Sequence, residues 1–576
     1  MAGGAALNVF KMSASGVPKE AFNWRLWFAV FVFGLLGAAR GVDEGLITGV
    51  FNSDNFKESL GLDQLDDDAL AGVKGNVSSM VQLGSIPGAL LYDLDMLHNM
   101  AFFACDYLGR VWATRQLCII WLIGIAIFMG NNGSMAAVYF GRFFAGIGIG
   151  ETVVVGPVYL SEISPAPIRG LCTCAFTGAV YLGILIAYFA NYGAELHLSG
   201  GISRWVSLES LTHRLNVLTL WQMVPTSVHL MFGVIILFAS IFAWESPRHL
   251  MRKGKEQEAI HVMAKLRGME PTAPYVIDEI AGIAASLASE QEASAGMGWK
   301  GTVREILTIR RNAYRLFLTN FAQLMACWSG GSAITVYAPD LFKIVGITGE
   351  EQSLLSTAIF GVVKLVASVI CALFLIDTIG RKRSIIAGIT LQVIAFFYVA
   401  IFLNIVPIDR QENYQTSASE QSASTGAIAM IYVSGAGWAL GWNSGQYLLS
   451  SELFPLRIRA VCSSVTMAMH FIGQYTVNKA LPSMLLYNEG LTPSGTFYFF
   501  GVISVLGAIW VWLCVPEASG RSLESIDQLF ELPWYKIGLY GRKFAEDYDR
   551  QQSTREQLDE KRDRVVIEHM EARAEA

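Results

Sequence analysis

The sequence predicts an all-α membrane protein in which twelve transmembrane helices form two pseudo-symmetric six-helix bundles. Composition is the first reason: of 576 residues, 53% are hydrophobic and only 16% are charged, with a mean hydropathy of +0.42, which excludes an ordinary soluble protein. Many apolar runs also reach the roughly 20 residues that a helix needs to cross about 30 Å of hydrocarbon. The third reason is an internal repeat, which indicates duplication of a half-length chain.

Two motifs occur once in each half of the chain, in the same order. Residues 106–110 read DYLGR, and residues 377–381 read DTIGR. Residues 162–169 read EISPAPIR, and residues 452–459 read ELFPLRIR, with Glu, Pro and Arg at identical spacing. Two apolar runs separate the first motif from the second in each half. Chance does not readily produce two matched repeats in one order, so both halves are predicted to share one fold.

The apolar runs place the twelve helices in order along the chain. We expect them near residues 26–50, 77–105, 117–130, 136–160, 170–192, 225–244, 315–344, 353–376, 384–406, 426–451, 460–485 and 496–515. After the sixth helix, Ile260, Met263 and Leu266 recur at helical spacing, which predicts short linker helices; a plain solvated linker is the alternative. The predicted division is a cytoplasmic N-terminus (1–24), an N-terminal bundle (25–246), cytoplasmic linker helices (247–312), a C-terminal bundle (313–516) and a cytoplasmic C-terminal tail (517–576).

Charges in the joints between helices predict the orientation in the membrane. Alternate joints carry arginine or lysine, for example Arg110, Arg248 and Arg381, whereas residues 52–74 and 409–425 are acidic, Ser-rich or neutral. Short cytoplasmic loops collect Lys and Arg, so we expect both termini to be cytoplasmic. The chain has no apolar core before its first long run, so we do not expect a cleaved signal peptide.

The sequence has no pattern typical of an enzyme or a metal site. Its net charge of -6 argues against a nucleic-acid partner. Eight cysteines fall in or beside apolar runs without C-x-x-C spacing, so we interpret them as small packing residues. No constellation of nucleophile and base occurs, and we therefore expect no enzymatic activity, no cofactor and no metal.

Several charged residues fall at membrane depth, where an ionised group costs a few kcal/mol unless it is paired or faces water. They are Arg40, Asp43 and Glu44 in the first run and Arg142 and Glu151 in the fourth. Arg40 could pair with either acid on its own helix, and Asp43 could reach Arg142. A carboxylate that alternates between an Arg partner and water suits a proton carrier. The alternative is a static ion pair that locks two helices.

The repeated motifs predict a gate at the cytoplasmic ends of the helices. Their glycines permit tight turns, and the following arginines can pair with acids on adjacent helix ends. Such a network would hold the cytoplasmic faces together while the outer side is open; anchoring by positive charge alone is the alternative. The predicted gating residues are Asp106, Gly109, Arg110, Glu162, Arg169, Glu245, Arg248, Asp377, Gly380, Arg381, Glu452 and Arg459.

A longer set of motifs runs from about Trp24 to Phe530. The most specific are Glu-Ser-Pro-Arg at residues 245–248 and Pro-Glu-x-x-Gly-Arg at residues 516–521. The others are Gly41-x-Asp43, Asp106-x-x-Gly109-Arg110, Gly141-Arg142 with Gly146, Gly148 and Gly150, Pro157-Val-Tyr159-Leu-Ser-Glu162, Tyr337-Ala-Pro339, Asp377-x-x-Gly380-Arg381-Lys382 and Ser451-Glu452-Leu-Phe-Pro455. Together they resemble the sugar porter family of the major facilitator superfamily, in a form similar to fungal sugar or quinate permeases.

The resemblance implies the major facilitator fold, a central substrate site and transport by alternating access. In proton-coupled members of the family, the Asp of the first helix, here Asp43, pairs with the Arg of the fourth helix, here Arg142. Facilitative glucose carriers have a neutral residue at the first position. Because this chain keeps both charges, Asp43 and Arg142 are the predicted proton-coupling residues.

The positions that contact the sugar in this family differ here. Thr177 stands where Gln is usual, Tyr447 where Trp is usual, and His470 and Gln474 where Asn is usual. Because a buried sugar hydroxyl without a partner costs about 1 to 3 kcal/mol, we do not expect ordinary D-glucose specificity. Helix packing is the alternative role for each candidate. The candidate substrate-binding residues are Arg40, Thr177, Gln323, Ser332, Tyr337, Asn443, Tyr447, His470 and Gln474.

We expect a plasma-membrane secondary transporter that takes up a monosaccharide or related polyhydroxylated compound together with protons. Its expected partners are the substrate (sugar, polyol or quinate-like), the proton and the lipid bilayer. The alternatives are a quinate or sugar-acid symporter in which Arg40 binds the carboxylate, a facilitative uniporter that would not need Asp43, and a non-transporting nutrient sensor. We favour a neutral substrate because Asp43 and Glu44 already outnumber the single guanidinium.

Two stretches look foreign to the family. Residues 92–100 place two Asp, a His and an Asn inside the second apolar run, where they should break the helix. Residues 206–221 separate segments that related chains join directly. We favour retained introns over genuine loop insertions, and genomic and transcript sequence would decide between them.

Overall fold

Helices make up almost all regular structure in the described residues, and no strand occurs among them, which agrees with the all-α prediction. The two foreign-looking stretches and the end of the predicted tail lie outside those residues. The computed structural model describes residues 18–52, 54–91, 109–131, 133–165, 168–197, 224–294, 299–371, 374, 380–406, 417–443, 445–446, 449, 453–487, 490–517, 529–530, 532–533 and 536–539.

Each expected span has a counterpart among these helices. The first six are α2 (Trp24–Asn52), α4 (Asp67–Leu91), α6 (Arg110–Met129), α7 (Met135–Ile163), α8 (Arg169–His197) and α10 (Val224–Ile241). The second six are α15 (Arg310–Trp328) with α16 (Gly331–Val336) and α17 (Ala338–Ile344), then α18 (Glu350–Ile370), α20 (Arg381–Ile405), α21 (Ala418–Leu440), α23 (Leu456–Met484) and α24 (Thr492–Cys514). The linker contains α11 (Pro247–Arg252), α12 (Glu256–Arg267), α13 (Pro274–Ser294) and α14 (Trp299–Thr308).

Eight described helices are long and apolar enough to cross a membrane, namely α2 with the turn before it, α6, α7, α8, α18, α20, α21 and α24. α10 supplies a shorter apolar helix, Thr226–Ile241. Helices α4, α15 and α23 are more polar along their length, with Gly, Ser, Asn and Gln inside α4, two arginines at the start of α15, and Arg, His, Gln, Asn and Lys within α23. They pack among the apolar helices all the same, so composition understates the number of membrane-crossing elements.

The seventh span is not the single helix expected over residues 315–344. α15 ends at Trp328, and Gly330 adopts a left-handed conformation with φ of +84° that begins α16. A second break falls at Tyr337, after which Pro339 occupies the first turn of α17. Irregular backbone at membrane depth is tolerated only where other parts of the protein bury it or a cavity lies beside it. The breaks on either side of α16 therefore favour a binding site next to this helix.

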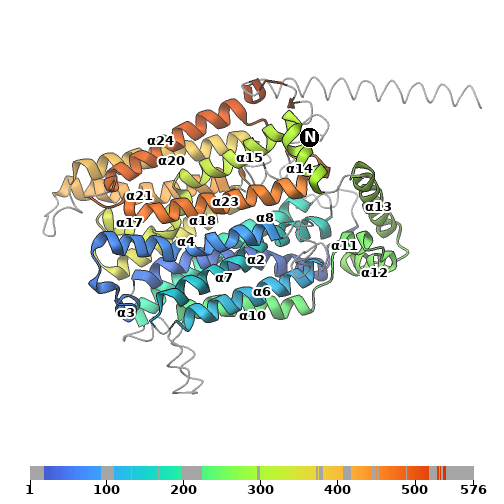
Figure 1. Ribbon diagram of the computed structural model, residues 1–576, viewed down its shortest axis with the longest axis horizontal. Helices are drawn as coiled ribbons and strands as arrows, with labels where there is room; N and C mark the ends of the chain where they lie inside the picture. The colour runs from blue at the N-terminus through green and yellow to red at the C-terminus, as the bar shows by residue number, and fades with distance from the viewer. Residues whose placement is uncertain are drawn as a thin grey trace, which may run out of the picture.

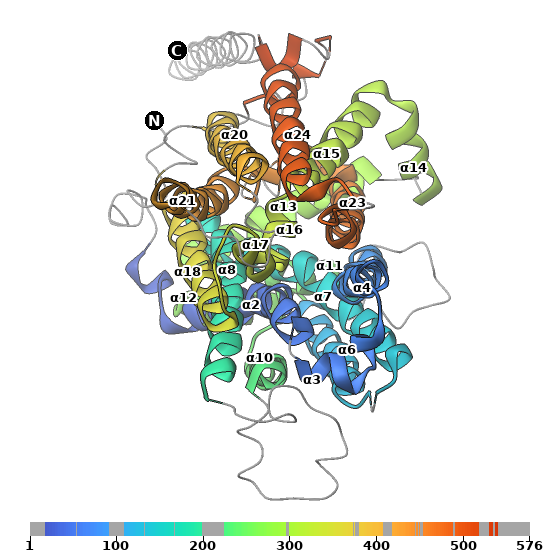
Figure 2. The same ribbon diagram turned by 90° about the vertical axis from the view of Figure 1, so that its left-hand side faces the viewer.

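The helices pack mainly within their own half of the chain. α2 packs along α8 and also contacts α7 and α10, while α4 and α6 both pack on α7. In the second half, α20 packs on α21 and α24, and α15 packs on α23. Figure 2 shows α2, α6, α7 and α10 in its lower part and α15, α20, α21 and α24 in its upper part. The halves meet chiefly where α4 contacts α23 and where α8 contacts α18.

Glycines allow α2 and α8 to approach each other closely. A Cβ atom on Gly41 would overlap the carbonyl group of Val180, and one on Gly183 would overlap the carbonyl group of Ala38. Small residues of this kind let two membrane helices touch backbone to backbone. Asp43 follows Gly41 by two residues, so this contact fixes the position of its carboxylate.

The linker helices α11, α12 and α13 lie together at one end of the long helices, here called the linker end (Figure 1). The opposite end, where α3 (Asp54–Ser59) and α17 lie, is called the far end. Arg267 of α12 pairs with Glu279 of α13, Nε to Oε2 2.7 Å, and donates to the carbonyl of Ile163, 2.9 Å, at the end of α7. This contact anchors the linker to the first half.

Candidate functional site

A buried ion pair joins α2 to α7. Arg142 Nη1 lies 3.2 Å from Asp43 Oδ1, its Nη2 lies 3.4 Å from Asp43 Oδ2, and its Nε donates to the carbonyl of Val77, 2.9 Å. The side chains of Asp43 and Arg142 are each 2% exposed. The two residues predicted as the proton-coupling pair are thus in direct contact, in the arrangement that the resemblance implied.

His229 of α10 is a third member of this cluster, and sequence reasoning missed it. Its Nε2 lies 3.5 Å from Asp43 Oδ1, and its ring makes an edge contact with Trp121, 6.0 Å between centroids. A histidine inside an apolar run was the available signal. Glu151, expected to be paired, instead has a buried Oε1 without a hydrogen-bond partner among the described residues. The expectation that a charged group at membrane depth has a partner is therefore met by Asp43 and not by Glu151.

A small central cavity lies between the two halves. Six of the predicted substrate-binding residues line it: Arg40, Thr177, Ser332, Asn443, His470 and Gln474. Sequence reasoning had not picked several other lining residues, namely Tyr181, Thr335, Lys364 and Trp438.

The three remaining candidates lie elsewhere. Gln323 sits behind the cavity wall, where its Oε1 lies 3.0 Å from His470 Nδ1. Tyr337 does not line the cavity, and its hydroxyl donates to the carbonyl of Asn478, 2.8 Å. Tyr447 lies outside the described residues. Gln323 therefore acts on the cavity through His470.

Arg40 connects α2 with α23 across the cavity. Its Nε lies 3.2 Å from Glu44 Oε1, and its Nη2 lies 2.9 Å from His470 Nε2 and 3.5 Å from Gln474 Oε1. A guanidinium can only donate, so His470 Nε2 accepts and Nδ1 carries the proton that is donated to Gln323. His470 is therefore the neutral Nδ1–H tautomer in this arrangement. Arg40 is thus bonded to three side chains, one on its own helix and two on α23.

At the linker end, Arg110 forms a two-bonded ion pair with Glu162, Nε to Oε2 3.1 Å and Nη2 to Oε1 3.0 Å. Its Nη1 also lies 3.0 Å from His249 Nδ1. All three residues belong to the first half or to the helix that follows it. This pair therefore closes one half on itself, whereas the predicted latch was to join the two cytoplasmic faces.

Glu245 and Glu517 cap equivalent helices in the two halves. Glu245 accepts hydrogen bonds from the backbone N–H of Arg110, 2.8 Å, and Val111, 3.2 Å, at the start of α6. Glu517 accepts from the backbone N–H of Arg381, 3.0 Å, and of the residue after it, 3.2 Å, at the start of α20. Burial raises the pKa of the Glu245 carboxyl, and these N–H groups oppose that shift. The two halves, which repeat the same sequence motif, therefore also repeat the same pair of capping hydrogen bonds.

Glycines make these caps possible. Gly109 and Gly380 have φ of +100° and +96°, and a Cβ atom on either would overlap the carboxylate of the capping glutamate. Such backbone angles favour glycine because other residues are strained there. The tight turns predicted at both glycines are present, and the acids that meet them come from the ends of α10 and α24.

The other predicted gating residues that the structure describes have contacts in different places. Arg169 is exposed at the start of α8. Arg248 Nη2 lies 3.4 Å from Ser286 Oγ on α13, and Arg459 donates to the carbonyl of Phe454 within its own half, 3.0 and 3.1 Å. Three residues lie outside the described part of the chain: Asp106, Asp377 and Glu452.

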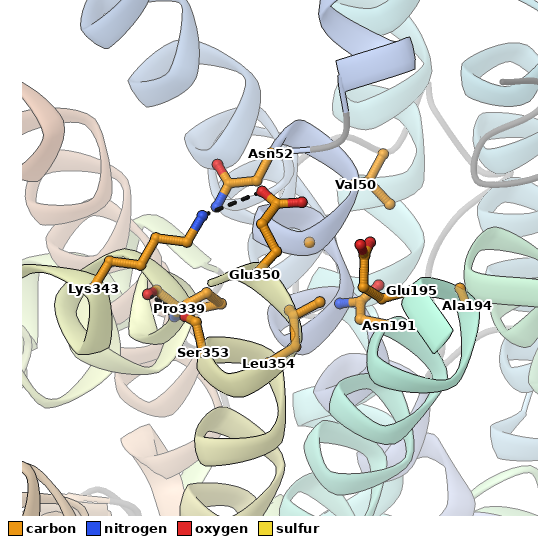
Figure 3. A pocket seen from close by; sticks show the side chains of 11 residues that line it. Val50, Asn52, Asn191, Ala194, Glu195, Pro339, Lys343, Glu350, Ser353 and Leu354 are labelled. Atoms are coloured by element: carbon orange, nitrogen blue, oxygen red, sulfur yellow. Dashed lines mark hydrogen bonds and ion pairs between the residues drawn. The ribbon is translucent and has the colours of Figure 1, made fainter. Parts of the chain in front are cut away.

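Asp340 joins the two halves at the far end, and this cluster was not predicted. Lys74 Nζ lies 2.7 Å from Asp340 Oδ2, Asn52 Nδ2 donates to Asp340 Oδ1, 2.8 Å, and Lys74 also donates to Asn52 Oδ1, 2.8 Å. Beside it lies a pocket in which the Lys343–Glu350 pair, 3.2 Å, faces the α8 residues Asn191 and Glu195, and Asn52 also lines this pocket (Figure 3).

We predict that Arg110→Ala lowers the maximal rate of uptake at least tenfold and changes apparent substrate affinity by less than about twofold. The substitution leaves Glu162 buried without its partner and distorts the linker end of the first half, which lowers the fraction of carrier able to complete the cycle, whereas other residues line the cavity and binding is not affected. The measurement is the concentration dependence of initial uptake. Lys255→Ala, which breaks an exposed ion pair with Glu258 at the same end, is the control and should change neither parameter. A pure loss of affinity would contradict the gating role.

Comparison with known proteins agrees with this architecture. A family model described as "Sugar (and other) transporter" matches residues 29–530. A probable quinate permease of Aspergillus flavus is 28% identical over 537 residues, covering 92% of this chain and 94% of that protein. A quinate permease of Neurospora terricola is 28% identical over 561 residues, covering 95% and 97%.

Solved structures show the same fold. The partially occluded inward-open xylose transporter XylE from E. coli aligns with a TM-score of 0.67 at 19% identity, covering 87% of this chain and 100% of that one. The proton:xylose symporter XylE bound to 6-bromo-6-deoxy-D-glucose aligns with a TM-score of 0.67 at 21% identity, covering 88% and 99%. The predictions of a transporter and not an enzyme, and of the major facilitator fold, are confirmed. This chain belongs to the sugar transporter family of the major facilitator superfamily.

Proposed function

We propose that this chain is a proton-coupled uptake carrier for a polyhydroxylated ring compound, either a monosaccharide or a related acid such as quinate. The carrying observation is that two buried sites share one helix: Asp43 of α2 contacts Arg142, while its neighbours Arg40 and Glu44 line the central cavity. The names of the relatives and of the structural neighbour, quinate permease and xylose transporter, support this substrate chemistry.

Proton coupling would follow from the proximity of these sites. A movement of α2 that opens the cavity also alters the distance from Asp43 to Arg142 and the access of water to its carboxylate. A carboxylate that loses a cationic partner binds a proton more readily. Protonation of Asp43 and occupation of the cavity would then favour the same conformational change, and substrate and proton would cross together.

We further propose that the linker end faces the cytoplasm, with both termini on that side, in the plasma membrane. Arg110, Arg248 and Arg381 gather at this end, the pattern typical of cytoplasmic loops. The far end would face the outside, and the contacts of Asp340 would close the outer entrance in this conformation. Residues 25–246 and 313–516 would move as two bundles about the cavity, with the predicted gating residues at the cytoplasmic ends.

Uptake by a yeast strain that lacks its own hexose transporters tests the function. Cells expressing the chain should accumulate at least one labelled compound among hexoses, pentoses, polyols and quinate above its external concentration. The unbuffered medium should become more alkaline when that compound is added, because protons enter with it. Equilibration without accumulation or alkalinisation would favour the facilitative uniporter, and no uptake of any compound would overturn the proposal.

A further inference from the structure

We propose that Lys364 binds the carboxylate of the substrate, which makes the transported compound a polyhydroxylated ring acid in preference to a neutral sugar. This inference rests on the proposed transport function and names the substrate class of the central cavity. Arg40 was the residue that the sequence offered for this role. The arrangement of charge inside the cavity points to Lys364 instead.

Lys364 is a buried basic residue on the cavity wall contributed by α18. It is 1% exposed, and its Nζ donates a hydrogen bond to Thr335 Oγ1 on α16. The ammonium also lies 5.3 Å from the ring centroids of Tyr181 and Phe360. Among the described residues no carboxylate forms an ion pair with it, and Glu44 acts on it only at longer range.

The other charges of the cavity already balance one another. Arg40 and Glu44 form an ion pair with Nε to Oε1 at 3.2 Å, and His470 is neutral because its Nε2 accepts from Arg40. Of the charged groups that line the cavity, Lys364 is thus the cation left without an adjacent anion. An ammonium at this depth is costly unless an anion or water meets it, and a substrate carboxylate would supply that partner.

Other polar atoms of the same cavity suit the hydroxyl groups of the ligand. Ser332 Oγ and Gln446 Oε1 line the cavity, are buried, and have no hydrogen-bond partner among the described residues. Ser332 lies three residues before Thr335 on α16, so it stands on the helix face that Lys364 contacts. Trp438 adds an aromatic wall that suits the apolar face of a ring. One cation beside several hydroxyl-binding atoms fits a ring acid better than a neutral sugar.

Arg40 is a weaker candidate because its donors are already engaged. It binds Glu44, His470 and Gln474, and its guanidinium lies 5.4 Å from the Phe471 ring centroid. Its contacts connect α2 to α23 and so serve the junction between halves. Lys364 has a hydroxyl and two ring faces, and a carboxylate can join these without displacing an anion.

Paired substrates and isosteric substitutions test the inference. We expect quinate and D-glucuronate to compete with labelled substrate at least tenfold more strongly than D-glucose, which lacks the carboxylate. Lys364→Met keeps an unbranched side chain, one atom shorter, and removes the charge, and it should weaken quinate competition at least tenfold while changing competition by D-glucose less than twofold. Lys364→Arg should retain most of the preference for acids. Lys343→Met, which removes a half-exposed lysine of the far-end pocket, is the matched control and should leave the preference intact.

Binding to the purified carrier gives a readout that does not depend on transport. Quinate should raise the melting temperature of the unmutated protein and of Lys343→Met, and it should lose this effect on Lys364→Met, whose own melting temperature shows whether it has folded. Equal weakening of acids and neutral sugars, or acid preference that survives in a folded Lys364→Met, would overturn the assignment. Accumulation of neutral sugars with no competition by acids would also overturn it while leaving the transport function standing; absence of any transport would instead refute the function.

Discussion

Asp43→Asn is expected to abolish uphill accumulation of substrate while leaving exchange across the membrane measurable. The amide fills the same volume beside Arg142 and His229 but cannot take up and release a proton, so the carrier can still change conformation without drawing energy from the proton gradient. The measurement is the ratio of internal to external substrate at steady state, combined with exchange of labelled for unlabelled substrate in membrane vesicles.

Glu151→Gln is the matched control for this experiment. Glu151 is also a buried acid of the first half, 3% exposed, but no ion pair joins it to another described residue. The control should accumulate substrate and make the medium alkaline much as the unmutated carrier does. If Asp43→Asn keeps full accumulation and Glu151→Gln loses it, the proton site has been assigned to the wrong carboxylate.

Gly183→Val is expected to remove most of the folded carrier. The added side chain would overlap the carbonyl group of Ala38 and force α2 and α8 apart. Overpacking of a tight contact commonly costs about 1 to 3 kcal/mol. Because this contact is between two helix backbones, we expect a cost of about 3 kcal/mol or more. The measurement is the yield and melting temperature of a fluorescent fusion in detergent. Gly178→Val on the same helix is the control, because a Cβ atom there meets nothing within 4 Å. Equal yields of the two variants would contradict a backbone contact at Gly183.

Much of this architecture could be predicted from the sequence, because burial in a membrane requires long apolar runs with few charges. Apolar runs predicted the helices, and the cost of a charge in hydrocarbon led directly to Asp43 and Arg142. The same rule applied to the run 353–376 would have found Lys364, a lone cation among apolar residues. The resemblance to the family does not point to this residue, because Lys364 is not one of the family's sugar positions.

Other features could not be predicted from the sequence, because they depend on which helices become neighbours. Asp340 meets Lys74 and Asn52 only because α17 and α4 come together at the far end, a pairing that a single sequence does not state. The break at Gly330 falls in the short run Ser329-Gly330-Gly331-Ser332, and the long apolar stretches on either side of that run outweighed its signal for a bend. His229 looked like an isolated polar residue until α10 packed against α2 and brought its ring to Asp43.

The contacts of the capping glutamates also indicate which interactions have to change during the transport cycle. Glu245 and Glu517 each bind the first turn of a helix in their own half, so a rocking motion of one half against the other leaves both sets of bonds unchanged. The activation enthalpy of that motion must then arise from contacts that span the two halves, which include those of Asp340 and those of Arg40 with α23. The temperature dependence of turnover should therefore respond to changes at the outer entrance and the cavity, and remain nearly constant when either cap is altered without unfolding its turn.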